Sequence, residues 1–187
     1  MKSILGISLC SLFCLGVCDL VQADNWMRFR GPTGQGLSNE TNLPVTWSAT
    51  ESVKWKTSLP GKGWSSPIVY EDLIFLTAST EEGVSCQVIC LNRKDGSVNW
   101  TTEVHRQKPG PMRKQNSYAT PTPVTDGKHV YSVFYDGTII AVDFSGKIVW
   151  KNSEIDFFSL HGLGASPIVA NGQVIMPFDG SSRDETQ

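Results

Sequence analysis

The residues from Ala119 to Trp150, ATPTPVTDGKHVYSVFYDGTIIAVDFSGKIVW, decide the fold of this chain of 187 residues. Three turn pairs, Asp126-Gly127, Asp136-Gly137 and Ser145-Gly146, divide this stretch into four short runs rich in apolar and β-branched residues. Asp-Gly between such runs favours tight hairpins whose twist matches that of the flanking strands. The sequence therefore predicts a four-stranded antiparallel meander, apolar on both faces, with strands over 119–125, 128–135, 138–144 and 147–150.

The same pattern occurs before and after this stretch. Residues 64–100 repeat the small residues before a proline, the polar turns and the closing tryptophan, and residues 164–180 begin a third copy. The closing tryptophans, Trp55, Trp100 and Trp150, are spaced by 45 and 50 residues. A period in the forties with four strands per unit is typical of a β-propeller, in which each sheet packs against the next. We therefore predict an all-β fold, a partial β-propeller of four-stranded antiparallel blades.

The repeats also predict the organisation of the chain. Blade 1 is expected over 64–103, blade 2 over 118–151 and the start of blade 3 over 164–187. Before them we expect an extended N-terminal arm over 24–51, and then a strand over 52–60 that closes the last blade of the ring, because its apolar and polar residues alternate. A ring needs roughly four to eight blades of about forty residues. The sequence thus indicates a fragment of a longer protein, with about seven or eight blades in the whole.

The first 23 residues have the features of an export signal. Lys2 precedes an apolar run over 4–17, and Val21-Gln22-Ala23 offers small residues for cleavage. Such a run is short for a membrane span, so we expect an exported protein without a transmembrane span, periplasmic or extracellular after cleavage near Ala23. Lipid attachment at Cys18 is the less favoured alternative, because valine suits the position before that cysteine poorly.

Charge and cysteine content exclude some classes of function. The formal net charge is −2 and charged residues make up 18% of the chain, which leaves no basic footprint for nucleic acid. After export only Cys86 and Cys90 remain, on one face of a predicted strand and about 13 Å apart, whereas bridged Cα atoms usually lie within about 7 Å. We expect two small buried apolar residues, because no further Cys or His stands at the spacing of metal ligands.

A basic insert over 104–117 separates the two complete units. Its two prolines and its glycine favour a solvated loop between blades. The alternative is a loop that recruits an anionic ligand or partner at the mouth of the channel. Its basic residues are His105, Arg106, Lys108, Arg113 and Lys114.

Small polar residues recur where each blade begins. The first strand of a blade lies nearest the ring axis, so bulky side chains would collide there, and proline is acceptable at the first residue of a strand. Ligands of proteins tend to lie in concave sites such as the mouth of the channel. The candidates for ligand contacts at this mouth are Ser65, Ser66, Asn116, Ser117, Thr120, His161, Ser166 and Asp179.

The third and fourth strands of both units carry a motif. CLNRKDGSVNW over 90–100 and AVDFSGKIVW over 141–150 resemble the Ala-x-Asp-x-x-Thr-Gly-x-x-x-Trp motif of pyrroloquinoline-quinone (PQQ)-like propeller repeats. In that family the tryptophan of one blade packs between neighbouring blades and the glycine turn hydrogen-bonds to it. The resemblance implies a structural docking role between blades, and no catalytic role, for Trp55, Trp100, Trp150, Gly96 and Gly146.

The family includes two kinds of protein, and fold alone does not decide between them. Quinoprotein alcohol and sugar dehydrogenases carry PQQ and Ca²⁺, and many have a bridge between adjacent cysteines. This chain has no adjacent cysteines after export and no acidic cluster of the kind that Ca²⁺ requires. The other kind is an exported scaffold, similar to the propeller subunit of the outer-membrane β-barrel assembly machine.

We therefore expect a non-catalytic protein- or ligand-binding scaffold in the cell envelope, with no evident cofactor. An envelope protein or peptide is the expected partner, and a small molecule remains open. The alternative is a PQQ- and Ca²⁺-dependent dehydrogenase whose site lies largely outside this sequence.

Overall fold

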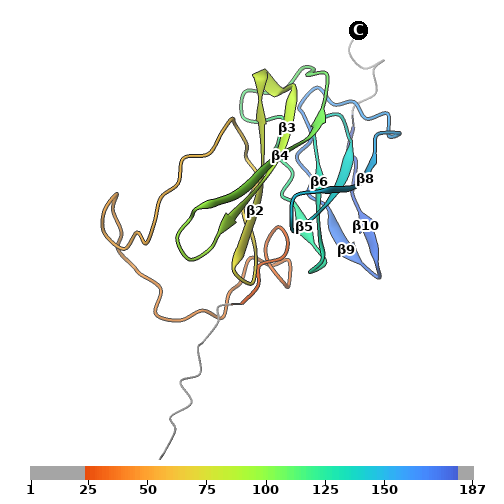
Figure 1. Ribbon diagram of the computed structural model, residues 1–187. Coiled ribbons are helices and arrows are strands. Elements are labelled where there is room, and N and C mark those ends of the chain that lie inside the picture. Colours follow the sequence, from red (N-terminus) through yellow and green to blue (C-terminus); the bar gives the residue numbers. More distant parts are fainter. Residues whose placement is uncertain (1–23, 181–187) are drawn as a thin grey trace, which may run out of the picture.

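The computed structural model describes residues 24–180 and is all-β, which confirms the predicted fold class (Figure 1). These residues form two four-stranded antiparallel sheets and a two-stranded hairpin. The strands are β1 (Ile68–Tyr70), β2 (Leu73–Thr80), β3 (Ser85–Asn92), β4 (Val98–Arg106), β5 (Val124–Thr125), β6 (His129–Val133), β7 (Ile139–Asp143), β8 (Ile148–Asn152), β9 (Ile168–Ala170) and β10 (Gln173–Ile175).

Blade 1 is the sheet β1-β2-β3-β4, in which each strand pairs with the next along the chain. Its first turn contains Glu71, which has a positive φ of 52°. Its second turn is longer, because the 3-10 turn η1 (Glu81–Gly83) joins β2 to β3. The register pairs Thr80 with Ser85 next to this turn, so the two strands remain paired up to the tip of the blade.

Blade 2 repeats this order as β5-β6-β7-β8. The glycines of its three turns, Gly127, Gly137 and Gly146, have φ values of 85° to 87°, a region that side chains other than glycine rarely occupy. The strands follow the predicted order but are shorter at their starts. Of the first expected strand, 119–125, only Val124 and Thr125 pair with β6, because the residues before them include two prolines, which cannot donate to a ladder.

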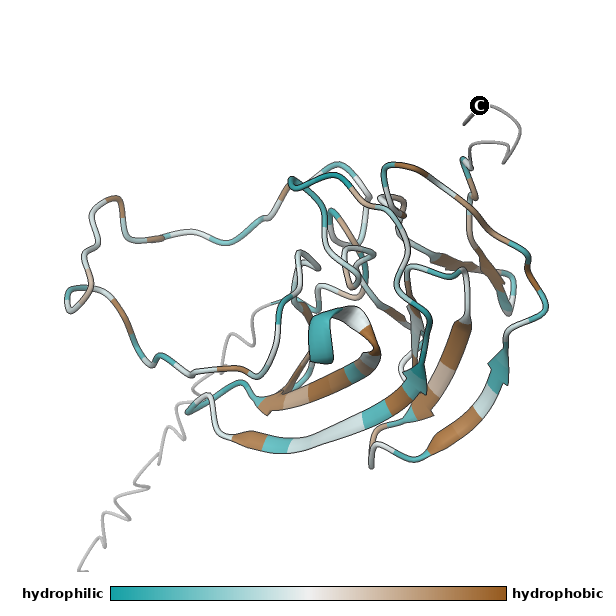
Figure 2. Cartoon of the chain, turned by 90° about the horizontal axis from the view of Figure 1, so that it is seen from above, coloured by the Kyte–Doolittle hydropathy of each residue, from teal (hydrophilic) through white to brown (hydrophobic). Residues whose placement is uncertain are grey.

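The most extensive buried cluster of the described residues lies between the two blades, as stacking of apolar sheets requires. This cluster joins Phe75, Cys86 and Cys90 of blade 1 to Phe134 and Ile140 of blade 2, among other residues. Figure 2 shows many of the hydrophobic residues on the strands, with hydrophilic residues on both strands and connections. Both cysteines are free and buried, as expected from the sequence, and burial raises the pKa of each thiol.

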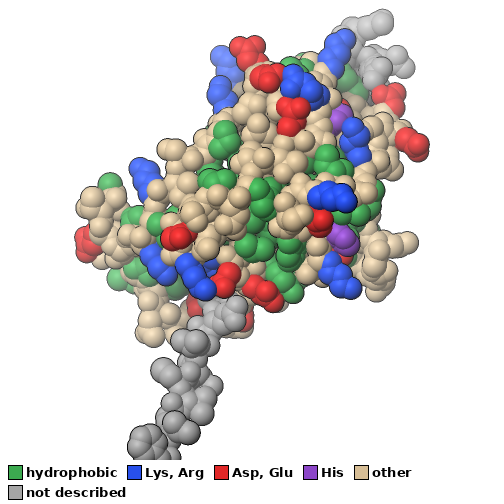
Figure 3. Space-filling view, in the orientation of Figure 1, with side chains coloured by type: hydrophobic (Ala, Val, Ile, Leu, Met, Phe, Trp, Pro, Cys, Tyr) green, Lys and Arg blue, Asp and Glu red, His purple; other side chains and the backbone are tan. Residues whose placement is uncertain are grey.

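The arm before blade 1 has two parts. Trp26 forms an antiparallel bridge with Val69 of β1, and the Thr125 N–H donates to the Met27 carbonyl, so the first part lies against both blades. The remainder forms a wide loop that stands away from the blades (Figure 1). Figure 3 shows hydrophobic side chains along this loop, and the exposed large residues there include Leu37, Leu43, Val45 and Trp47.

One expectation is wrong, and a second one stays a prediction. His105 and Arg106 were expected in the loop over 104–117, but they belong to β4, because they pair with Cys86 and Ser85 of β3. Residues 52–60 form no strand with any residue in the described range, so closure of a ring by this segment remains a prediction. The expected signal, with Ala23 and Cys18, and the last residues of the chain lie outside the described residues. Within 24–180 no helix is long and apolar enough to cross a membrane.

Candidate functional site

A line of hydroxyl groups joins the starts of three successive blades. The Ser66 N–H donates to Thr122 Oγ1 at 2.9 Å, and the Thr122 N–H donates to Ser166 Oγ at 3.0 Å. Each of these residues directly precedes a proline. Ser65, one residue earlier, is tied to β2, since its hydroxyl exchanges hydrogen bonds with the backbone of Thr77. The Ser66 backbone and the Ser166 hydroxyl thus join neighbouring blades, and Ser65 bonds within blade 1, whereas ligand contacts of these serines stay a prediction.

The other predicted mouth residues form a second polar group between the entries of blades 2 and 3. Asn116 Nδ2 donates to the His161 carbonyl at 2.8 Å, and its Oδ1 accepts from the Ser117 N–H and from the Thr120 hydroxyl. The structure thus brings these four residues together. Asp179 is exposed, and within the described range no hydrogen bond or ion pair links it to the group.

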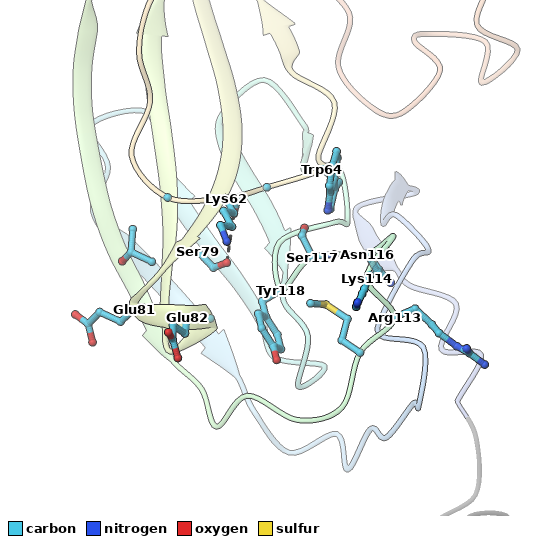
Figure 4. Close-up of a pocket in the computed structure, with 15 residues that line it drawn as sticks. Lys62, Trp64, Ser79, Glu81, Glu82, Arg113, Lys114, Asn116, Ser117 and Tyr118 are labelled. Atoms are coloured by element: carbon cyan, nitrogen blue, oxygen red, sulfur yellow. Dashed lines mark hydrogen bonds between the residues drawn. The ribbon is translucent and has the colours of Figure 1, made fainter.

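A cleft of about 1080 Å³ opens beside this group, between the tip of blade 1 and the loop that leads into blade 2 (Figure 4). Its walls come from three segments that are far apart in the sequence. They are the segment just before blade 1, the η1 tip, and the second half of the expected basic loop. Its lining residues include Gly61, Lys62, Gly63, Trp64, Ser79, Thr80, Glu81, Glu82, Gly83, Met112, Arg113, Lys114, Asn116, Ser117 and Tyr118.

The first wall is held rigidly against blade 1. The backbone of Lys62 exchanges hydrogen bonds of 2.9 and 2.8 Å with that of Ser79, and the Trp64 N–H donates to the Ala119 carbonyl at 3.1 Å. A Cβ at Gly63 would lie 2.5 Å from the Thr77 carbonyl oxygen, so glycine allows this close approach. The Trp64 side chain nevertheless remains 63% exposed. A large aromatic is therefore presented to solvent on a fixed backbone.

The opposite wall is the η1 tip, which packs on Tyr118. Gly83 has a φ of 101°, and its Cα lies against the Tyr118 ring. The Tyr118 hydroxyl donates to the Gly110 carbonyl at 2.9 Å, and its ring meets that of Tyr135 edge-on at 5.2 Å. This tyrosine fixes the loop over 104–117 to both blades, so the floor of the cleft is built from packed residues.

The five basic residues of the expected partner loop do not form one surface. His105 Nε2 lies 2.7 Å from Asp136 Oδ2 of blade 2, and Arg106 forms ion pairs with Glu81 at 2.5 Å and with Glu103 at 2.8 Å. Arg113 Nε donates to His161 Nδ1 at 3.1 Å. Within the described residues no ion pair involves the remaining two, Lys108 and Lys114.

The mouth residues do not fit a calcium ion. Ca²⁺ takes six to eight oxygen ligands, whereas the Asn116 oxygen already accepts two hydrogen bonds and His161 offers ring nitrogens. In the part of the chain that the structure describes, no group of three or more His, Cys, Asp or Glu side chains could hold a metal ion. We therefore derive no chemistry through PQQ or Ca²⁺ at these residues.

On the outer side, a tryptophan and a threonine of one segment dock on the glycine turn of the next. Trp100 Nε1 donates to the Phe144 carbonyl at 2.9 Å and Thr102 Oγ1 to the Gly146 carbonyl at 3.0 Å. The earlier copy is equivalent: Trp55 Nε1 donates to the Arg93 carbonyl at 3.0 Å, and Thr57 Oγ1 to the Gly96 carbonyl at 2.6 Å. Trp150 is 40% exposed, and its ring lies 5.9 Å from that of Tyr131 in its own blade.

Two sets of residues at these contacts and in the cleft were not predicted from the sequence. Thr57 and Thr102 each stand two positions after a docking tryptophan, and this Trp-x-Thr spacing was a usable signal. The cleft residues Lys62 and Trp64 were also missed. The signal for them was the glycine pair at 61 and 63, which marks a close backbone approach.

Comparisons with known proteins place these features in a family. The family model described as "Outer membrane protein assembly factor BamB" matches residues 37–120 and 83–182. No curated protein matches the chain.

Among solved structures, BamB from Moraxella catarrhalis is similar with a TM-score of 0.51 and 18% identity, over 68% of this chain and 38% of that one. Quinohemoprotein alcohol dehydrogenase ADHIIG from Pseudomonas putida HK5 is similar with a TM-score of 0.55 and 20% identity, over 81% and 22%. Quinohemoprotein alcohol dehydrogenase from Comamonas testosteroni is similar with a TM-score of 0.56 and 17% identity, over 83% of this chain and 23% of that one.

These likenesses show the fold, and the chain spans well under half the length of each of these structures. The family model, in contrast, covers most of this chain. The chain belongs to the family of PQQ-like propeller repeats that the BamB model describes.

Proposed function

We propose that this chain contributes blades to an exported propeller that serves in the cell envelope as a protein-binding scaffold, and that the cleft at the tip of blade 1 is its contact site. The observation that carries the proposal is Trp64, which is 63% exposed although its backbone is fixed by hydrogen bonds. Tryptophan on a rigid support is typical of residues that dominate binding energy at protein interfaces. The assembly role printed for the matching family supports a protein partner and an envelope location.

The polar residues near the cleft support binding rather than group transfer. Asn116, Ser117, Thr120 and His161 are bonded to one another or to the entries of neighbouring blades. Such bonds keep the cleft in one shape. A preformed surface loses less conformational entropy on binding than a mobile one.

Site-specific photo-crosslinking tests this proposal. A photoreactive residue placed at Lys114, on the cleft wall, is expected to form an adduct with a discrete envelope protein, identified by mass spectrometry and reproduced with that protein purified. The matched control is the same residue at Lys128, which is exposed in the β5–β6 turn at the other end of blade 2.

Absence of an adduct at Lys114, or the same adducts at both positions, would overturn the proposal. Reduction of an electron-acceptor dye by the full-length protein with PQQ and Ca²⁺, using electrons from an added alcohol or sugar, would instead favour the dehydrogenase alternative.

A further inference from the structure

The cleft carries an excess of uncompensated positive charge. Lys62 and Lys114 form no ion pair with a carboxylate among residues 24–180. On the opposite wall, Glu81 is held by Arg106, with 2.5 Å between Oε2 and Nη2, and Glu82 is the remaining carboxylate. A cleft with an excess of one sign of charge attracts ligands of the opposite sign. The electrostatics therefore favour an anionic occupant.

The spacing of the lining residues suits an extended peptide. Lys62 and Trp64 stand two positions apart on the segment before blade 1, on either side of Gly63. Both line the cleft, and Lys114 lies on the loop across from them (Figure 4). A strand-like ligand repeats its side-chain direction every two residues. Its carboxylates can meet the lysines while a neighbouring apolar side chain lies on the indole.

We propose that the cleft binds an extended acidic segment of a partner protein, with its carboxylates on Lys62 and Lys114 and an aromatic or aliphatic side chain on Trp64. This inference rests on the proposed function, because it names the partner chemistry of the same cleft. An acidic polysaccharide would also supply carboxylates. The peptide is favoured because the matching family model describes an assembly factor, and the partner of such a factor is a protein.

Two synthetic peptides test this chemistry. The first is acetyl-Asp-Glu-Phe-Asp-Glu-amide, and the second has the same length and shape with Asn and Gln in place of the acids. Binding to the full chain is measured by thermophoresis at two salt concentrations. We expect the acidic peptide to bind about tenfold more tightly than its neutral counterpart, and its affinity to fall as salt rises, since exposed charges are screened.

Variants connect this binding to the cleft. Lys62→Gln and Lys114→Gln are each expected to lower the affinity for the acidic peptide about threefold to fivefold. Trp64→Ala is expected to lower it about tenfold. Lys128→Gln, outside the cleft, is the matched control and should leave the affinity unchanged. Circular dichroism of each variant checks that the sheets remain folded.

Equal affinity for both peptides, or loss of affinity only with Lys128→Gln, would overturn the inference. So would tighter binding of polygalacturonate that depends on the same lysines, because the occupant would then be a sugar acid. If crosslinking at Lys114 captures a partner but the acidic peptide fails to bind, this inference alone is wrong. If the peptide binds and no partner is captured, the chemistry of the cleft stands and the scaffold function is wrong.

Discussion

Blades 1 and 2 place equivalent tryptophans in different surroundings. Trp100 on β4 donates to the Phe144 carbonyl of blade 2 and lies 6.1 Å from the ring of Phe75. Trp150 on β8 is 40% exposed, and its ring contact is with Tyr131 of its own blade. The same motif therefore contributes differently to the stability of the fold at each position. The contribution depends on which residues of the neighbouring segment contact the indole.

The tips of the two blades differ as well. In blade 1, β2 and β3 have eight residues each and are joined by η1, which forms a wall of the cleft. In blade 2, β6 and β7 have five residues each and end in a turn at Asp136, which His105 of blade 1 reaches. The paired strands repeat, whereas the tips vary. Binding residues are commonly found on such variable connections over a rigid scaffold.

The largest expected effect comes from removing the docked tryptophan. Trp100→Ala should lower the free energy of unfolding by about 2–4 kcal/mol, because it leaves a cavity between blades and removes the hydrogen bond to Phe144. Trp150→Ala should cost less than about 1 kcal/mol, because that indole lacks a partner blade among the described residues. Urea unfolding followed by circular dichroism measures both values. Equal losses would show that the two blades do not differ in this way.

A second effect concerns Gly146, which lies against the indole of Trp100. Gly146 and Gly172 both have positive φ, 87° and 71°. A Cβ at Gly146 would lie 2.8 Å from Trp100 Cδ2, whereas nothing lies within 4 Å of one at Gly172. We expect Gly172→Ala to cost about 1 kcal/mol through backbone strain alone, and Gly146→Ala about 1–2 kcal/mol more through overpacking. Thermal unfolding compares the two variants, and similar midpoints would contradict a close contact at Gly146.

The smallest effect depends on pH and compares the first turns of the two blades. Burial disfavours the charged form of Asp126, but hydrogen bonds from the backbone of His129 and Lys128 and from the Tyr131 hydroxyl lower its pKa to about 2. An unperturbed aspartate titrates near about 3.9. The lowered pKa therefore stabilises the fold above about pH 4, and this contribution is lost as the pH falls toward about 2.

Asp126→Asn should lower the free energy of unfolding by about 1 kcal/mol near neutral pH, and the difference from the unaltered chain should shrink below about pH 4 and vanish below about pH 2. Its counterpart in blade 1, Asp72, is 60% exposed and pairs with Lys94 at the surface. Asp72→Asn should change stability by less than about 0.5 kcal/mol at any pH. Denaturant titrations over a pH series test both. A constant penalty for Asp126→Asn across the series would contradict the assigned hydrogen bonds.

Much of the fold could be predicted because the turns are marked in the sequence. Asp-Gly and Asn-Gly pairs separate apolar runs, and the observed hairpins turn at Gly127, Gly137 and Gly172. Strand ends were less predictable. His105 and Arg106 continue β4 because β3 offers them a paired neighbour, and that register depends on a partner strand, not on their own side chains. Their charges suggested a loop, but carboxylates of η1, β4 and blade 2 compensate them.

The candidate site was only partly predictable. The small polar residues at the blade entries are visible in the sequence, but Thr122 was not among the predicted mouth residues, because the bonding of the entries depends on contacts between blades. Thr122 accepts from Ser66 and donates to Ser166, which lie 56 and 44 residues away along the chain. The cleft is formed by segments around residues 62, 82 and 114. No local sequence pattern predicts that these three segments lie close together, because their positions depend on how blade 1 packs against blade 2.

The hydroxyl contacts at the blade entries have a consequence for how such rings evolve. At both described junctions the backbone N–H of one entry residue donates to the hydroxyl of the next unit's entry residue, from Ser66 to Thr122 and from Thr122 to Ser166. Because these two junctions are chemically alike, a duplicated unit that begins with Ser/Thr-Pro can form the same contact with either neighbour. These contacts therefore do not determine the number of blades in a ring. That number depends on the angle between adjacent sheets, which the side chains packed between them set.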